Sequence, residues 1–145
     1  MKLLIGICAL LWCQSAFAKV PEVFIKTVAM ESASQSSFGK FLVARVILNR
    51  ARIKGKTVEA VCLAPYQFSC NNTDSKTRAW RKAWLDRHYT PKVRQECLES
   101  INKAIVASGY NRITHYHTLS VRPFWAKGKT ASITEGKHKF YEGIK

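Results

Sequence analysis

Glu31 is the one carboxylate in the stretch AMESASQSSFGKFLVARVILNR, residues 29–50, where the other side chains are small, apolar or basic. Phe24, Val28 and Glu31 are spaced by four and three residues, so on a helix the carboxylate continues an apolar stripe. Such a carboxylate is either the ion-pair partner of a Lys or Arg, or a group that carries a proton during catalysis. Considered alone, this cation-rich stretch favours the ion pair.

Three histidines form a second group of residues that could take part in chemistry. His115 and His117 are two residues apart in an extended segment and therefore share a face, and His138 follows later in the chain. An H-x-H pair with a later His is a combination that can bind zinc, and zinc peptidases also attack cell walls. No H-E-x-x-H or similar pattern accompanies these residues, so we expect neither a metal nor another cofactor.

The first 18 residues have the three parts of a secretory signal peptide. Met1-Lys2 supplies a positive charge, the apolar run LLIGICALLW follows, and Ala16-Phe17-Ala18 forms an A-x-A cleavage site. The apolar run is too short for a permanent membrane span. We therefore expect cleavage after Ala18 and a secreted or periplasmic protein. The remaining residues 19–145 are expected to form one small domain.

The chain is strongly basic, with 24 Lys and Arg against 9 Asp and Glu and a formal net charge of +15. Such a surface attracts polyanions, and an exported protein meets anionic cell-wall polymers, lipid head groups and extracellular nucleic acid. A cationic binding protein without catalysis is therefore an alternative, since KTRAWRKAWLDRHYTPKVR places Trp80 and Trp84 on one helical face. No recognised nucleic-acid motif occurs, so we expect anionic wall polymers as partners and a monomeric protein.

Three cysteines remain after residue 18, and an odd number allows at most one internal pair. Cys62 and Cys70 flank the short loop LAPYQFS, whereas Cys97 falls on an apolar helical face. We expect a Cys62–Cys70 disulfide, which an oxidising compartment permits, and a buried thiol at Cys97.

The elements that position Glu31 are mainly helical. Pro21 suits the first turn of a helix ending near Glu31, and Ser36 or Ser37 can cap a long central helix that Lys54 and Gly55 end. Further helices are expected from Thr57 to Cys62, at 78–88 and from Thr90 to Gly109, followed by an extended segment at 113–119 and a hairpin at 132–143 that turns near Gly136. Together they predict one α+β unit, mainly helical, with a short C-terminal β region.

Residues 31–50 resemble the signature of the cell-wall hydrolases related to spore cortex-lytic enzymes. In that family a Glu near the end of one helix precedes a longer helix that closes with VILNR. The shared residues are Glu31, Gly39, Val43, Val46, Ile47, Leu48, Asn49 and Arg50. Further matches follow in the family's order: Gln67-Phe68-Ser69, Thr114-His115-Tyr116, Pro123 with Trp125, and His138 with Phe140 and Tyr141.

The resemblance implies a lysozyme-like α+β fold and cleavage of the MurNAc–GlcNAc β-1,4 bond in peptidoglycan glycan strands, usually by a lytic transglycosylase. It places Glu31 at the catalytic position, where a carboxyl group can protonate the leaving glycosidic oxygen. The remaining residues are expected to line the sugar groove and bind substrate: Gln67, Ser69, Tyr116, His115, Trp125 and Gln35.

Gln35 departs from the family pattern, because this chain reads ESASQ where members commonly carry EARGE. A hydrolase needs a second carboxylate, either to activate water or to act as a nucleophile. A transglycosylase does not, since the C6 hydroxyl of the same MurNAc closes a 1,6-anhydro ring. The substitution therefore favours 1,6-anhydro-MurNAc products. The alternative is a hydrolysing muramidase that uses Asp74, Asp86 or Glu135 as the second acid.

Overall fold

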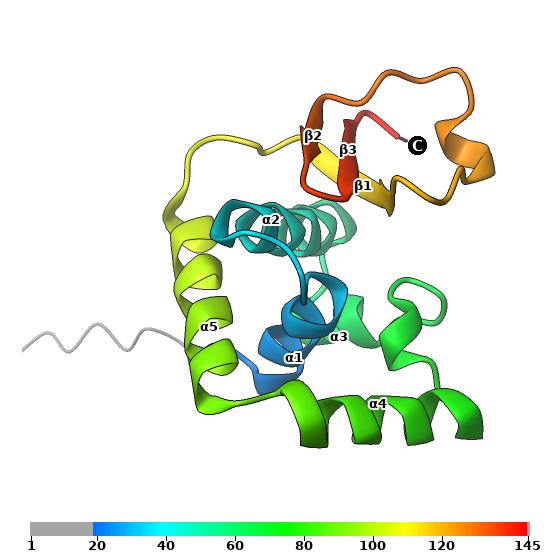
Figure 1. The fold of residues 1–145 in the computed structure, drawn as a ribbon. Coiled ribbons are helices and arrows are strands. Elements are labelled where there is room, and N and C mark those ends of the chain that lie inside the picture. Colours follow the sequence, from blue (N-terminus) through cyan, green and yellow to red (C-terminus); the bar gives the residue numbers. More distant parts are fainter. Residues whose placement is uncertain (1–18, 145) are drawn as a thin grey trace, which may run out of the picture.

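The computed structural model describes residues 19–144, and the predicted signal peptide at 1–18 lies outside the described residues (Figure 1). The described chain forms helices first and a small sheet last. The helices are α1 (Glu22–Glu31), α2 (Ser37–Lys54), α3 (Val58–Leu63), α4 (Ser75–His88) and α5 (Pro91–Val106), with short 3-10 turns η1 (Ser69–Asn71) and η2 (Phe124–Ala126). The strands are β1 (Ile113–Thr118), β2 (Ile133–Glu135) and β3 (His138–Glu142). In the part of the chain that the structure describes, no helix combines the length and the apolar character that a membrane span requires.

Helix α2 is the central element, and α3, α5 and β1 all pack against it. It begins where the Ser36 hydroxyl accepts a hydrogen bond from the Gly39 amide at 3.1 Å. It ends at Gly55, whose φ of 58° is the left-handed conformation typical of a helix C-terminus. Both ends agree with the prediction from sequence.

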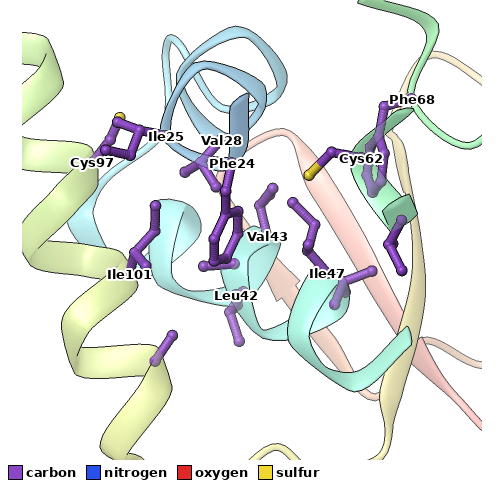
Figure 2. Close-up of a cluster of buried hydrophobic side chains, with 14 of the residues drawn as sticks. Phe24, Ile25, Val28, Leu42, Val43, Ile47, Cys62, Phe68, Cys97 and Ile101 are labelled. Carbon is purple, nitrogen blue, oxygen red and sulfur yellow. The ribbon is translucent and has the colours of Figure 1, made fainter. Parts of the chain in front are cut away.

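The hydrophobic core lies where α1, α2 and α5 meet (Figure 2). Phe24 and Val28 of α1, Leu42 of α2 and Ile101 of α5 are each at most 1% exposed. Burying a side chain of this size contributes about 1.5–3 kcal/mol. Because Phe24 and Val28 are held in this core, the C-terminal end of the same helix is fixed in place, and Glu31 with it.

The sheet has the order β1-β3-β2, and both pairs of neighbours are antiparallel. Tyr116 is opposite Phe140, while His117 is opposite Lys139. Since side chains alternate along a strand, Tyr116 and Phe140 share one face, and His117 and Lys139 share the other. The hairpin predicted around Gly136 joins β2 to β3, which completes the mainly helical α+β fold expected from the sequence.

The predicted Cys62–Cys70 disulfide is not present in the structure, where Cys62, Cys70 and Cys97 are free, buried thiols. Hydrogen bonds hold the loop instead: the Asn71 side-chain amide donates to the Cys62 carbonyl at 2.8 Å and to the Thr27 hydroxyl at 2.9 Å. Burial raises the pKa values of the Cys62 and Cys97 thiols to about 11, which keeps them protonated. The expectation of a buried thiol at Cys97 agrees with the structure.

Candidate active site

Glu31 is the last residue of α1 and is half-buried at the edge of a pocket of about 370 Å³. The helix ends there because Ser32 leaves the helical conformation while its amide still bonds to the Val28 carbonyl at 3.0 Å. The Glu31 side chain therefore lies at the end of the helix, where it lines the pocket. The pocket is lined by Met30, Glu31, Ser69, Cys70, Trp80, Tyr116, His117, Thr118, Val121 and His138.

Tyr116 of β1 is the hydrogen-bond partner of Glu31. Its hydroxyl donates to Glu31 Oε2 at 2.7 Å. Burial, followed by the charge of Glu31, raises the pKa of Tyr116 well above its ordinary value, so the hydroxyl keeps its proton and stays a donor. One carboxylate oxygen is thus oriented by β1, and the buried Cys70 thiol also interacts with the Glu31 carboxylate, which contributes to the raised pKa of that thiol.

Arg50 interacts electrostatically with both Glu31 and Tyr116, but it does not form a salt bridge with Glu31. Its Nε donates to the Thr114 carbonyl at 2.7 Å, and its guanidinium lies 5.3 Å from the centre of the Phe68 ring. Burial lowers the pKa of Arg50, and its electrostatic interactions with Tyr116 and Glu31 act in the opposite direction. None of the salt bridges within residues 19–144 includes Glu31, so among these residues it is not the ion-pair partner of a Lys or Arg.

The three acids considered as second carboxylates are engaged elsewhere. Asp74 caps α4 by accepting from the Thr77 amide at 2.8 Å, and Asp86 pairs with Lys82 at 2.5 Å. Glu135 accepts a hydrogen bond from the Ser36 hydroxyl at 2.6 Å. None of them is among the described residues that line the pocket, where Glu31 is the one acid.

His138 is a pocket residue whose role the sequence motif did not reveal. It is 4% exposed, its ring centre lies 5.1 Å from that of Tyr116, and its Nδ1 is buried with no hydrogen-bond partner among the described residues. Burial, and then the charge of His117, lowers the pKa of His138. The ring is therefore a neutral polar group packed against the tyrosine that orients Glu31.

A comparison with protein families matches residues 34–141 to the model of the family described as Cell Wall Hydrolase. The match covers well over half of the chain and begins just after Glu31. The chain belongs to the cell wall hydrolase family. It is accordingly an enzyme that acts on peptidoglycan, as the sequence predicted.

Among solved structures, this cell wall hydrolase is similar to the catalytic domain of the Bacillus cereus SleB protein. The TM-score is 0.56 and the sequence identity 21%, with 85% of this chain and 92% of that chain covered. At this identity the likeness shows a shared fold. A comparison with curated protein sequences gives no match.

The cell wall hydrolase brings three of its predicted site residues together in the pocket: Glu31, Ser69 and Tyr116. The amide oxygen of Gln67 lies outside the pocket lining and accepts from Arg50 at 3.4 Å and from Lys54 at 3.3 Å. Seven lining residues were not predicted as site residues from the sequence, namely Met30, Cys70, Trp80, His117, Thr118, Val121 and His138. Trp80 in particular belongs to none of the matched motifs.

Gln35 and the pair His115–Trp125 also lie away from the pocket lining. The Gln35 amide oxygen accepts from the Lys137 amide at 3.2 Å, in the turn between β2 and β3. Trp125 packs on His115 with ring centres 5.0 Å apart, on the sheet face opposite Tyr116. The side chain of Gln35 therefore stabilises the hairpin, and Trp125 attaches its loop to the sheet.

The three histidines do not converge on one point. His117 already uses both ring nitrogens, with Nδ1 2.7 Å from the Thr118 carbonyl and Nε2 2.8 Å from the Tyr141 hydroxyl. His138 occupies the Tyr116 face of the sheet, whereas His115 and His117 occupy the other. Among the described residues, no group of three His, Cys, Asp or Glu side chains is placed to hold a metal ion.

Proposed function

We propose that this cell wall hydrolase cleaves the β-1,4 bond between MurNAc and GlcNAc as a lytic transglycosylase, with Glu31 as its general acid and base. The observation that carries this proposal is the composition of the pocket. Glu31 is its one acid among the described residues, and Tyr116 orients the carboxylate at 2.7 Å. A transglycosylase uses one such group twice, whereas a hydrolase of the usual kind needs two.

In the first step Glu31 protonates the glycosidic oxygen as the C1–O bond of MurNAc breaks, so that GlcNAc leaves with a free hydroxyl. In the second step the C6 hydroxyl of the same MurNAc forms a bond to C1 and returns its proton to the Glu31 carboxylate. No water is consumed, and the enzyme ends in its starting protonation state. The product carries a 1,6-anhydro ring.

The walls of the pocket suit a sugar chain. Trp80 is 49% exposed and supplies a flat apolar face, and the Ser69 hydroxyl can exchange hydrogen bonds with sugar hydroxyls or N-acetyl groups. We further propose that the mature chain is the exported, monomeric unit at residues 19–145. Its excess of cations would hold it on anionic wall polymers between cleavage events.

The test is a Glu31→Gln variant with Glu99→Gln as its matched control. Glu99 is exposed on α5, where it accepts a hydrogen bond from Gln95 at 2.9 Å. Release of soluble fragments from purified peptidoglycan should fall by about 100- to 10,000-fold in Glu31→Gln and stay unchanged in Glu99→Gln. Pelleting with insoluble peptidoglycan and the melting temperature should be the same for all three proteins.

Two results would contradict the proposal. Glu31→Gln could release fragments at the wild-type rate, which would remove Glu31 from the chemistry. Alternatively, the wild-type protein could bind peptidoglycan without releasing anything, as a cationic binding protein does.

A further inference from the structure

A second pocket, of about 580 Å³, lies between the sheet and the loop that joins β1 to β2. Four of its lining residues are cations, and none of the described lining residues is an acid. The lining comprises His117, Arg122, Pro123, Phe124, Ala126, Lys127, Gly128, Lys129, Lys139 and Tyr141. We refer to it below as the cationic pocket.

The cationic pocket adjoins the Glu31 pocket. His117 lines both, and the successive loop residues Val121 and Arg122 line the Glu31 pocket and the cationic pocket respectively. The two pockets therefore share one wall, with Tyr116 and His138 of the Glu31 pocket on one sheet face and Lys139 and Tyr141 of the cationic pocket on the other. An extended substrate such as a substituted glycan strand can occupy both.

The loop that forms this pocket is held in a defined shape. Trp125 is packed against three rings of the sheet face, with ring centres 5.0 Å from His115, 5.7 Å from His117 and 5.4 Å from Tyr141. Turns follow directly, since the Lys127 amide bonds to the Phe124 carbonyl at 3.1 Å. The neighbouring Phe124 ring is left 92% exposed at the wall of the pocket.

The four cations are not neutralised by the protein. The salt bridges within residues 19–144 join Lys82 to Asp86, Arg94 to Glu22 and Arg112 to Glu142, and none includes Arg122, Lys127, Lys129 or Lys139. Like charges around one concavity repel each other, and a bound anion relieves that repulsion. Carboxylates accept charge-assisted hydrogen bonds from Lys and Arg, so they match this lining.

We propose that the cationic pocket binds the carboxylate groups of the peptide stem on the MurNAc next to the cleaved bond. This inference rests on the proposed function, because it takes a peptidoglycan strand as the substrate in the Glu31 pocket. The sugars of such a strand are uncharged, whereas the stem attached to each MurNAc carries free carboxylates. The enzyme is thus specific for strands with anionic stems, and the cationic pocket is the subsite that recognises them.

The experiment compares two substrates that differ in the charge of the stem. One is a soluble peptidoglycan strand with free stem carboxylates, and the other is the same preparation with those carboxylates converted to methylamides. The wild-type enzyme should cleave the free-carboxylate strand with a kcat/KM about tenfold higher, since a few partly exposed ion pairs add up to that ratio. Equal values of kcat/KM would overturn the inference.

A matched pair of double variants locates the effect. Lys127→Gln with Lys129→Gln removes two charges from the cationic pocket, and Lys92→Gln with Lys103→Gln removes two from α5, which lies away from the β1–β2 loop in Figure 1. The first double variant should cleave both substrates at the rate of the methylamide strand. The second should keep the tenfold preference, and the same loss in both variants would overturn the inference.

A binding measurement separates this inference from the proposed function, because it needs no cleavage. A free stem peptide should bind the wild-type chain more tightly than its methylamide form, and Lys127→Gln with Lys129→Gln should abolish the difference. If the peptide binds in this way but no strand is cleaved, the proposed function fails and the anion site stands. If glycerol phosphate binds at these residues and the stem peptide does not, the assignment to stem carboxylates is overturned.

Discussion

The Tyr116 hydroxyl donates a hydrogen bond to Oε2 of Glu31 at 2.7 Å, which connects β1 to the end of α1. The bond fixes one oxygen of a carboxylate that lines the pocket. Tyr116 in turn packs against His138 and Phe140, with ring centres 5.1 and 5.5 Å away. The sheet therefore positions the group proposed to carry the proton.

A Tyr116→Phe variant should keep the fold and lose most of the activity. The ring contacts remain, but the carboxylate loses a hydrogen bond of the charged type, worth about 1.5–3 kcal/mol. If that bond serves the reacting geometry, kcat should fall about 10- to 100-fold while KM changes little. Kinetics on soluble glycan strands would show this split.

Tyr110→Phe is the control for this variant, because Tyr110 packs on Phe38 and Phe41 away from the pocket. It should retain the wild-type kcat. A Tyr116→Phe enzyme with unchanged kcat, or with only its KM altered, would contradict a positioning role for the tyrosine.

Gly136 is required by the hairpin for two reasons. Its φ is +53°, and a Cβ atom added there would lie 2.2 Å from Gln35 Oε1. Gly136→Ala should therefore lower the free energy of unfolding by about 1–3 kcal/mol. Gly109→Ala is the control, because an added Cβ meets nothing within 4 Å there.

Denaturant midpoints of the two glycine variants would test this expectation, and equal midpoints would contradict it. Adding Gln35→Ala to Gly136→Ala should recover the part of the loss that comes from the collision. The part that comes from the left-handed backbone should remain.

His115 should make the stability of the protein depend on pH. Burial, with the charges of Arg50 and Lys54, lowers the pKa of His115 from 6.5 to about 4. Between these values the unfolded chain binds a proton that the folded chain does not, so stability is complete above pH 6.5 and falls as the pH approaches 4. After discounting for solvent screening, the loss from this residue is about 1–2 kcal/mol.

Denaturant midpoints measured between pH 7 and pH 4 would reveal this loss. His115→Gln should flatten the decline in part, because the lowered pKa of His138 also contributes to it. His88→Gln, at an exposed position on α4, is the matched control. An identical decline in His115→Gln and the wild-type protein would contradict the assignment.

The helix ends could be predicted from sequence because capping is local. Ser36, Thr57 and Thr90 each accept a hydrogen bond from the amide three residues later, as at Thr57 with Ala60 at 3.1 Å. Helix α4 begins earlier than the predicted residue 78, because Asp74 caps it from within a stretch interpreted as loop. Because the whole stretch is polar, the sequence did not distinguish the capping residue Asp74 from the loop residues around it.

The composition of the pocket was less accessible to sequence reasoning. His115 and Tyr116 are adjacent in one motif, yet only Tyr116 is among the described residues that line the Glu31 pocket, and His115 packs on Trp125 instead. Trp80 reaches the pocket because of the direction that α4 takes, which depends on tertiary packing. Gln35 is no longer the residue on which the argument for transglycosylation depends, because its side chain bonds to the hairpin. Transglycosylation is inferred instead from the pocket lining, in which Glu31 is the one acid among the described residues.

The most direct test of transglycosylation is the chemical nature of the new glycan ends. Purified peptidoglycan would be digested with the chain from residue 19 to 145 in water enriched in heavy oxygen, and the fragments would be weighed by mass spectrometry. We predict 1,6-anhydro-MurNAc ends, which lack the mass of one water and contain no heavy oxygen, because Glu31 is the one acid among the described lining residues. Reducing MurNAc ends that carry heavy oxygen would contradict transglycosylation and show that the enzyme is a hydrolysing muramidase.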